Sequence, residues 1–212
     1  KILSIPHPNA RRQIRRSRTS WVEHFVDEDG AWYLKTYRYD GLRAALRGAF
    51  RNTFAAPSRA RREARALELL AAAGVQADLE AEFLESRRFG FLREALLLTR
   101  DFGGSDLAEK LQEKPEDAGL ELEGWRALGR FVQALHDAGL RDPDLKARNL
   151  LLRRGEDGAW RFAKIDASSS RIVARNRRDA ARERDLRVLV SDLETLGTST
   201  DALAALRAGL EH

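Results

Sequence analysis

The chain of 212 residues contains no cysteine and no methionine. The absence of cysteine excludes disulfide bonds, thiolate-bound metal sites and cysteine nucleophiles. No stretch approaches the roughly 18–20 consecutive apolar residues that a membrane-spanning helix requires. With 43% hydrophobic and 33% charged residues, the composition argues against wholesale disorder. It predicts one globular domain, or two lobes that share one fold, with a hydrophobic core.

Acidic residues are missing from the first 22 positions, which carry six basic side chains before Glu23. Removing these six from the 38 lysines and arginines leaves 32, against 33 acidic residues. The formal charge of +5 therefore reflects a basic leader, assigned to residues 1–19, attached to a nearly neutral body. The leader lacks the apolar stretch of roughly 7–15 residues that marks a signal peptide, so we expect a cytoplasmic protein.

Alternating apolar residues predict a β-hairpin close to the start of the body. Its strands are expected at residues 21–26 and 31–37, separated by an acidic, glycine-containing turn. In the second strand, Trp32 and Leu34 share one face, whereas Lys35 lies on the other.

Two helices are predicted from apolar residues at helical spacing. Ser58 is the expected N-cap of the first and Gly74 its expected stop; the second covers residues 120–138 and ends at Gly139. A basic segment ahead of the first helix is predicted to be partly helical and contains Arg43, Arg47 and Arg51.

Apolar runs predict strands at residues 91–99, 150–152 and 160–165, and leucines at helical spacing predict a last helix over residues 186–196. Strands and one helix thus come first, and mostly helices with one small hairpin follow. This order predicts an α+β fold.

The residues with the clearest chemical meaning are Asp144 and Asn149, five positions apart in a loop, and Asp166 at the end of a strand. Phosphoryl transfer from a nucleotide needs such a set. One aspartate orients or deprotonates the attacking hydroxyl, while an asparagine and a second aspartate hold Mg²⁺ on the phosphates. Oxygen donors suit Mg²⁺ without any histidine or cysteine cluster.

At these residues the chain resembles the protein-kinase-like superfamily. The segment Asp142–Lys146 with Asn149 matches the catalytic-loop pattern H-R-D-L-K-x-x-N, and Asp166–Ser168 stands at the place of D-F-G. The order of motifs then predicts a strand lysine, Lys35, paired with a helix glutamate. Glu63 is our preferred partner and Glu68 the competing candidate, since both lie in the same predicted helix.

A closer resemblance is to the bacterial lipopolysaccharide core kinases, which phosphorylate Kdo or heptose of the inner core. It rests on residues 34–42, on 58–63 leading into 70–75, and on 97–100, and it extends over roughly residues 20–190. The resemblance implies a two-lobed, protein-kinase-like α+β fold. Residues 20–99 would form an N-lobe with a small antiparallel sheet and a helix, and residues 100–212 a mostly helical C-lobe.

The resemblance also implies roles for individual residues. Lys35 would contact the α- and β-phosphates of ATP and Glu63 would hold Lys35, while Asn149 and Asp166 would ligate Mg²⁺.

Two further residues would act on the acceptor and the transferred group. Asp144 would orient the sugar hydroxyl or accept its proton, and Lys146 would neutralise charge on the transferring phosphoryl group. The implied acceptor is a lipid-linked lipopolysaccharide core saccharide at the inner leaflet.

Some positions depart from the kinase pattern. Asp142 replaces the expected histidine, which predicts the loss of a packing and hydrogen-bonding anchor. No glycine occurs between Ser17 and Glu23, so any phosphate-covering loop is unconventional, and Ala167 follows Asp166 where phenylalanine is expected. A second D-F-G triplet, at residues 101–103, precedes the catalytic loop and is predicted to be a turn.

The basic leader and the arginine-rich segment 171–184 are open to two interpretations: solvated charge, or attraction to an anionic inner-membrane surface or phosphorylated glycolipid. We expect no nucleic-acid partner, because no recognition-helix, zinc or aromatic RNA-binding signature accompanies the arginines. Two alternatives to a core kinase stay open. One is another small-acceptor or RIO-like protein kinase, and the other is a non-catalytic pseudokinase scaffold at the membrane. The oligomeric state is left open.

Overall fold

The computed structural model describes residues 11–17, 19–39, 56–76, 79–114, 117–177 and 179–211. The chain divides into two compact units, one drawn from Lys1–Glu68 and Asp78–Asp101 and the other from Leu69–Ala77 and Phe102–His212. The predicted helical segment around Arg43, Arg47 and Arg51 lies outside the described residues, as does the leader up to residue 10.

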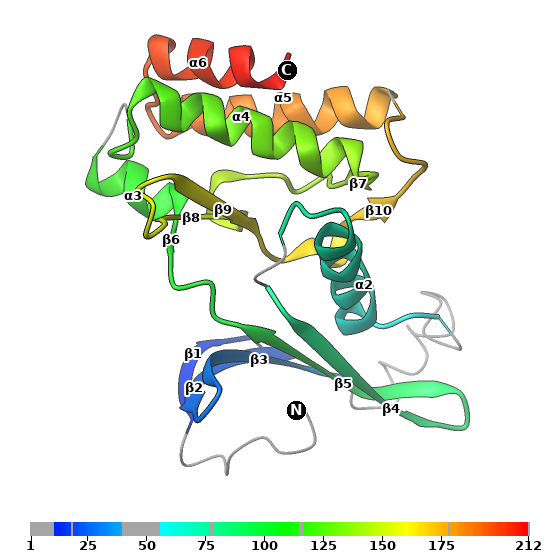
Figure 1. The fold of residues 1–212 in the computed structure, drawn as a ribbon. Helices are drawn as coiled ribbons and strands as arrows, with labels where there is room; N and C mark the ends of the chain where they lie inside the picture. Colours follow the sequence, from blue (N-terminus) through cyan, green and yellow to red (C-terminus); the bar gives the residue numbers. More distant parts are fainter. Residues whose placement is uncertain are drawn as a thin grey trace. The chain divides into compact units, whose positions relative to one another are not determined.

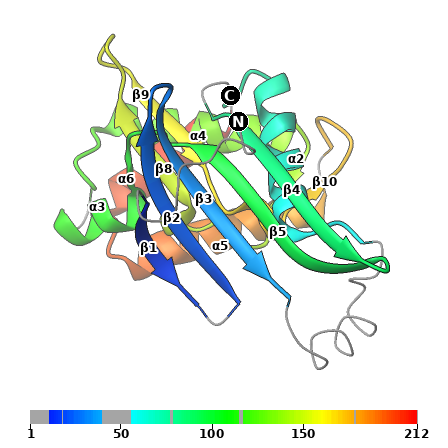
Figure 2. The same ribbon diagram turned by 90° about the horizontal axis from the view of Figure 1, so that it is seen from below.

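The first unit contains a five-stranded antiparallel sheet (Figures 1 and 2). Across the sheet the strands are β1 (Arg12–Arg16), β2 (Ser20–Asp27), β3 (Gly30–Arg38), β5 (Phe91–Arg100) and β4 (Ala81–Arg88).

The predicted β-hairpin is confirmed as β2 and β3, with Phe25 opposite Trp32. Trp32 and Leu34 pack with Phe25 and Leu98 in one apolar cluster. The period of two therefore places Lys35 on the opposite face, as expected from the sequence.

That opposite face is covered by helix α2 (Arg59–Ala72), from which Ala60 and Ala64 pack against Tyr37 and Leu97 of the sheet. Small side chains at these helix positions let the helix backbone approach the strands closely. The sheet thus has an apolar cluster on each face. The packing of α2 on the sheet places the helix side chains close to β3.

The predicted boundaries of α2 are confirmed. The Oγ of Ser58 accepts a hydrogen bond from the Arg61 amide at 3.0 Å, which satisfies one of the unpaired N–H groups of the first turn. Gly74 ends the helix with φ +71°, and the Val75 amide donates to the Leu70 carbonyl at 2.9 Å. This left-handed residue with its back-reaching bond is the usual glycine stop.

Two strands of the sheet were missed by sequence reasoning. β1 lies within the basic leader and all its side chains are exposed, so it has no apolar alternation to reveal it. β4 alternates in burial, but its outward positions include Leu84, which blurs the pattern. Both are edge strands of the sheet. Edge strands are less enclosed than central strands, so their sequences carry a weaker apolar pattern.

The second unit is mostly helical (Figure 1). Its helices are α3 (Leu107–Glu113), α4 (Leu122–Asp137), α5 (Ala180–Thr195) and α6 (Thr200–Leu210). Short strands accompany them: β6 (Ser105–Asp106), β8 (Leu150–Arg154) and β9 (Trp160–Lys164) form one sheet, and β7 (Leu140–Arg141) pairs with β10 (Arg171–Ile172). The mixture of helices and antiparallel strands in the chain agrees with the predicted α+β class.

The predicted second helix is confirmed as α4, which ends before Gly139 at φ +101°. Its apolar stripe, including Trp125 and Leu128, is buried. Helix α6 packs against α4 where Gly129 and Gly209 meet: a Cβ on Gly209 would lie 2.1 Å from the Arg126 carbonyl oxygen. The sequence reasoning ended the last helix at residue 196 and missed α6, although the N-cap Ser199 and the buried Leu203 and Leu206 at helical spacing were available signals.

Among the residues that the structure describes, no helix is both long and apolar enough to cross a bilayer.

Candidate active site

The strand lysine and the helix glutamate form an ion pair within the first unit. Lys35 projects from β3 and Glu63 from α2, with 2.8 Å between Nζ and Oε1. The lysine side chain is 19% exposed and the glutamate is buried. Glu68, the competing candidate, is exposed. A buried carboxylate thus holds a lysine whose side chain is partly exposed, an arrangement that can present a cation to an anionic ligand.

The connection between β1 and β2 contains no glycine and is held by hydrogen bonds between two serines. The Oγ atoms of Ser17 and Ser20 lie 2.8 Å apart, and the Ser17 amide donates to the Ser20 carbonyl at 2.7 Å. Local hydroxyl hydrogen bonds thus close this turn without glycine.

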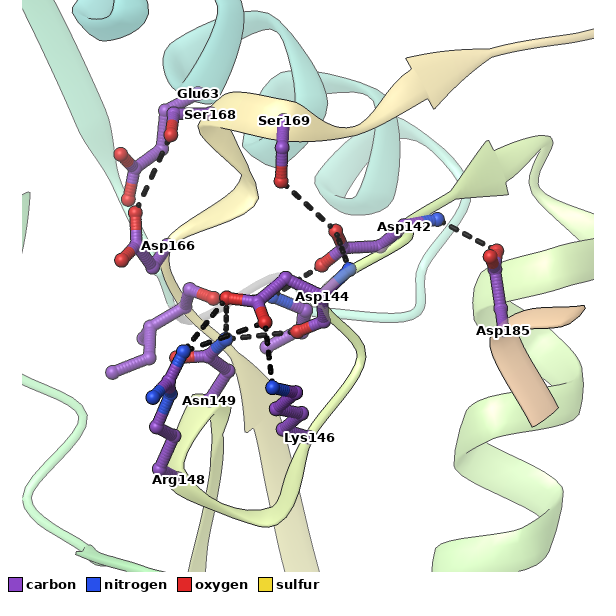
Figure 3. Close-up of polar contacts among 12 residues, drawn as sticks. Glu63, Asp142, Asp144, Lys146, Arg148, Asn149, Asp166, Ser168, Ser169 and Asp185 are labelled. Carbon is purple, nitrogen blue, oxygen red and sulfur yellow. Dashed lines mark hydrogen bonds and ion pairs between the residues drawn. The ribbon is translucent and has the colours of Figure 1, made fainter. Parts of the chain in front are cut away.

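The catalytic-loop candidates converge on the Asp144 carboxylate in the second unit (Figure 3). Its Oδ2 accepts hydrogen bonds from Asn149 Nδ2 at 3.2 Å and from Arg148 Nη2 at 3.1 Å. The Nζ of Lys146 lies 3.5 Å from its Oδ1. Three of the residues predicted from the sequence are therefore neighbours, and Arg148 joins them.

The surroundings of Asp144 favour its ionised form. Partial burial raises the pKa of this carboxyl, but the hydrogen bond and charge of Arg148, the amide of Asn149 and the charge of Lys146 outweigh it and lower the pKa. An ionised carboxylate of low basicity is suited to hold and orient a hydroxyl, with proton transfer completed as the bond to phosphorus forms.

Asn149 and Asp166 are brought together by the backbone. Asn149 ends a short 3₁₀ turn (Ala147–Asn149), and its carbonyl accepts the Ile165 amide at 3.0 Å. Asp166 follows directly, in the left-handed conformation with φ +55°. Aspartate tolerates this region better than most residues. The Asp166 carboxylate points toward Ser168, whose Oγ lies 3.5 Å from its Oδ1 (Figure 3).

The donors at these two positions fit Mg²⁺. Asn149 donates its Nδ2 to the carbonyl and carboxylate of Asp144, so its Oδ1 remains the atom available as a ligand. With the Asp166 carboxylate this makes two hard oxygen donors. In the described part of the chain no three His, Cys, Asp or Glu side chains gather as a metal site. Few protein ligands are typical of Mg²⁺ that is held mainly by nucleotide phosphates and water.

The prediction that Asp142, in place of histidine, loses a packing and hydrogen-bonding anchor was wrong. The side chain is buried, and its Oδ2 lies 2.7 Å from the Nζ of Lys164, which is itself fully buried. Its Oδ1 accepts the Asp144 amide at 3.0 Å and the Ser169 hydroxyl at 3.2 Å, and its own amide donates to Asp185 Oδ2 at 2.7 Å (Figure 3). An acidic residue can replace the expected histidine because a buried lysine neutralises it.

Several residues that support the loop were missed from the sequence. Lys164 also donates to the Ile165 carbonyl, which ties the loop of Asp142 to the segment that carries Asp166. Asp192 accepts the Ala147 amide at 2.9 Å. A lysine in the strand before Asp166, next to the buried Phe162 and Ala163, was the available signal, since buried lysines require a partner. The aspartates of α5 gave no such signal, because charged residues on a helix are usually solvated.

Gln76 holds the same strand from another side. Its side chain is buried. The Oε1 atom accepts a hydrogen bond from the Lys164 backbone N–H at 2.7 Å, and Nε2 donates to the Lys164 carbonyl at 3.1 Å. Both the backbone and the side chain of Lys164 are therefore fixed, which leaves this lysine little freedom to serve a ligand.

The upstream D-F-G triplet lies in an irregular segment. Residues 101–104 form neither helix nor strand, Gly103 has φ +71°, and the Asp101 carboxylate lies 3.3 Å from His24 Nε2. The segment predicted to be a turn is neither helix nor strand, and no turn is assigned to it.

The arginine-rich segment 171–184 is partly engaged within the protein. Arg182 lies 3.5 Å from Asp137 of α4 and is mostly buried, and Arg177 lies 3.6 Å from Asp179. These contacts favour an internal role for part of the segment's charge.

Comparison with known proteins gives consistent findings. The model of the lipopolysaccharide kinase (Kdo/WaaP) family matches residues 9–209. A 3-deoxy-D-manno-octulosonic acid kinase of Haemophilus influenzae (strain PittEE) is 33% identical over 76 residues, which make up 35% of this chain and 30% of that relative. The match thus spans less than a third of the relative's length.

A solved structure described as WaaP in complex with acyl carrier protein has a TM-score of 0.66 at 18% identity. The superposition covers 94% of this chain and 78% of the other. At this identity the likeness shows a shared fold.

Proposed function

The chain belongs to the lipopolysaccharide kinase (Kdo/WaaP) family, and we propose that it transfers a phosphoryl group from ATP to a sugar hydroxyl of the lipopolysaccharide inner core, on Kdo or heptose. The observation that carries this proposal is the Asp144 carboxylate held between Asn149, Arg148 and Lys146, with Asp166 on the adjoining loop. We also propose that the two compact units correspond to the N-lobe and C-lobe of a kinase.

Asp144 binds the acceptor hydroxyl and takes up its proton as the oxygen attacks the γ-phosphorus, while the bond from the γ-phosphorus to the β–γ bridging oxygen breaks and ADP leaves. Lys146, 3.5 Å from Asp144, neutralises charge on the transferring phosphoryl group. These are electrostatic and positioning roles, which dominate catalysis of phosphoryl transfer.

Lys35 binds the α- and β-phosphates of ATP, and Glu63 keeps its ammonium group in place. Asn149 and Asp166 supply oxygen ligands for Mg²⁺, which when bound neutralises charge on the phosphates. The support for these roles is the 2.8 Å ion pair of Lys35 and the hard donors at Asn149 and Asp166.

The acceptor class is inferred from the family and from the relative named as a 3-deoxy-D-manno-octulosonic acid kinase. Both Kdo and heptose are retained as acceptors. Because the core is assembled on a lipid anchor, the enzyme works at the cytoplasmic surface of the inner membrane, on the lipid-linked precursor.

The test is a transfer assay with γ-labelled ATP, Mg²⁺ and core oligosaccharides that end in Kdo or in heptose, read by mass spectrometry of the saccharide. The wild-type chain is expected to add one phosphate to one of them. Asp144→Asn keeps the shape of the side chain and is expected to lower kcat by about 10²–10⁴-fold. Transfer to protein alone, or undiminished transfer by Asp144→Asn, would contradict the proposal.

A further inference from the structure

The turn between β4 and β5 exposes a large aromatic side chain. Phe89 is 84% exposed, and it precedes Gly90 in a two-residue hairpin turn at one end of the sheet (Figures 1 and 2). Its backbone has φ +51° and that of Gly90 has φ +82°. Positive φ at both central residues is the geometry of a type I′ turn.

Phenylalanine is a poor choice for folding at this position. The first central residue of a type I′ turn favours asparagine, aspartate or glycine, and a bulky side chain is strained in the left-handed region. Burial does not compensate for the strain, because Phe89 lies almost wholly in solvent. A strained residue with no packing role points to a role outside the fold.

The turn is also strongly basic. Residues 87–93 contain three arginines and no carboxylate, the nearest acidic residues being Glu85 and Glu94. Arg87 is held by Glu85 and by the Gly90 carbonyl. The other two arginines, Arg88 and Arg93, are exposed, and the guanidinium of Arg88 lies 5.5 Å from the centre of the Phe89 ring.

We propose that this hairpin tip, residues 87–93, docks on an anionic phospholipid bilayer, with Phe89 inserted at the level of the headgroups and Arg88 and Arg93 against lipid phosphates. An aromatic ring with adjacent cations is the side-chain set that favours the membrane interface. The tip is the narrow end of a two-stranded hairpin (Figures 1 and 2). A deformable lipid surface accepts such an end, whereas a protein partner needs an extended complementary patch. The inference rests on the proposed function, since it gives the enzyme a means to meet a lipid-linked acceptor.

The β2–β3 turn provides a matched control within the same sheet. Val26 beside it is 68% exposed, but the turn carries Asp27, Glu28 and Asp29. An anionic bilayer repels such a turn. Removing Val26 therefore changes exposed apolar surface without touching the proposed docking element.

The first experiment measures cosedimentation of the full chain with phosphatidylcholine vesicles, with and without phosphatidylglycerol. Binding is expected only with phosphatidylglycerol and is expected to weaken at high salt. Arg88→Gln and Arg93→Gln should each lower partitioning about fivefold, the equivalent of about 1 kcal/mol per charge. Val26→Ser should leave it unchanged. Equal binding to neutral vesicles, or equal losses for Val26→Ser and the arginine variants, would overturn the proposal.

The second experiment uses Phe89→Asn, which places the preferred residue in the turn. The thermal midpoint is expected to rise because strain is relieved, while partitioning onto phosphatidylglycerol vesicles falls by roughly threefold to tenfold as the inserted ring is lost. A variant that binds vesicles as the wild type does would overturn the proposal. Binding of the wild type to acidic proteins but not to vesicles would do so as well.

The third measurement separates docking from catalysis. Phe89→Asn is expected to phosphorylate a soluble, lipid-free core saccharide at the wild-type rate and a vesicle-borne acceptor more slowly. If vesicle binding depends on Phe89 as expected but no saccharide is phosphorylated by the wild type, docking stands and the proposed function fails. If phosphorylation occurs and is equally fast on both acceptors in wild type and variant, docking fails and the function stands.

Discussion

Lys35–Glu63 and Lys164–Asp142 are both short lysine–carboxylate pairs, at 2.8 and 2.7 Å, but they differ in access to solvent. The Lys35 side chain is partly exposed, whereas Lys164 is enclosed and also donates to a backbone carbonyl. The open pair can offer positive charge to a phosphate. The enclosed pair can act only on its neighbours, by fixing the backbone of Asp144 through Asp142.

Breaking the enclosed pair is expected to have the largest effect. Lys164→Met leaves Asp142 as a buried, unneutralised carboxylate, and the free energy of unfolding should fall by about 3–5 kcal/mol. Urea denaturation followed by circular dichroism measures this loss.

The control for Lys164→Met is the double variant Lys164→Met/Asp142→Asn, which removes both charges. It should recover a large part of the lost stability, because no unpaired charge then remains buried. A double variant as unstable as Lys164→Met would show that packing, and not charge, explains the first result.

Breaking the open pair is expected to affect catalysis more than stability. Lys35→Met should lower kcat by about 10²–10³-fold, the typical effect of losing one preorganised electrostatic contact in a site. Its urea midpoint should move less than that of Lys164→Met, because solvent reaches this pair from the lysine side. If Lys35→Met were less stable than Lys164→Met and still active, the Lys35–Glu63 pair would not be the one that serves catalysis, and the distinction between the two pairs would be wrong.

The smallest expected effect concerns the charge beside Asp144. Arg148 lowers the pKa of Asp144, and activity that needs the ionised carboxylate is lost as pH falls through that pKa. Arg148→Ala raises the pKa, so the acidic limb of the kcat profile should move to higher pH. Arg126→Ala, which removes an arginine from an exposed ion pair on α4, should leave the limb in place. If the acidic limb of the kcat profile stays in place in Arg148→Ala, the limb reports the titration of a group other than Asp144.

The parts of the molecule that sequence reasoning predicted are those with local signals. Alternation gave β2 and β3, Ser58 and Gly74 gave the ends of α2, and the spacing of Asp144 and Asn149 marked a loop in which these two side chains meet. Each of these depends on residues close together in the chain.

The parts that were missed depend on distant partners. Whether Asp142 is an anchor depends on Lys164, and nothing near Asp142 in the chain shows that a lysine will neutralise it. The strand β1 owes its place to pairing with β2 and not to apolar side chains of its own. Helix α6 is the exception, because its N-cap Ser199 and its buried Leu203 and Leu206 are local signals that sequence reasoning did not use.

The Asp142–Lys164 pair has a consequence for how this sequence can diverge. A histidine at position 142 would face the buried ammonium of Lys164 without a neutralising carboxylate, and an apolar residue at 164 would leave Asp142 without its cation. Either single replacement gives a destabilised protein with an unpaired buried charge. We therefore expect the residues at positions 142 and 164 to change together. Descendants of this sequence are expected to keep both residues or to exchange both.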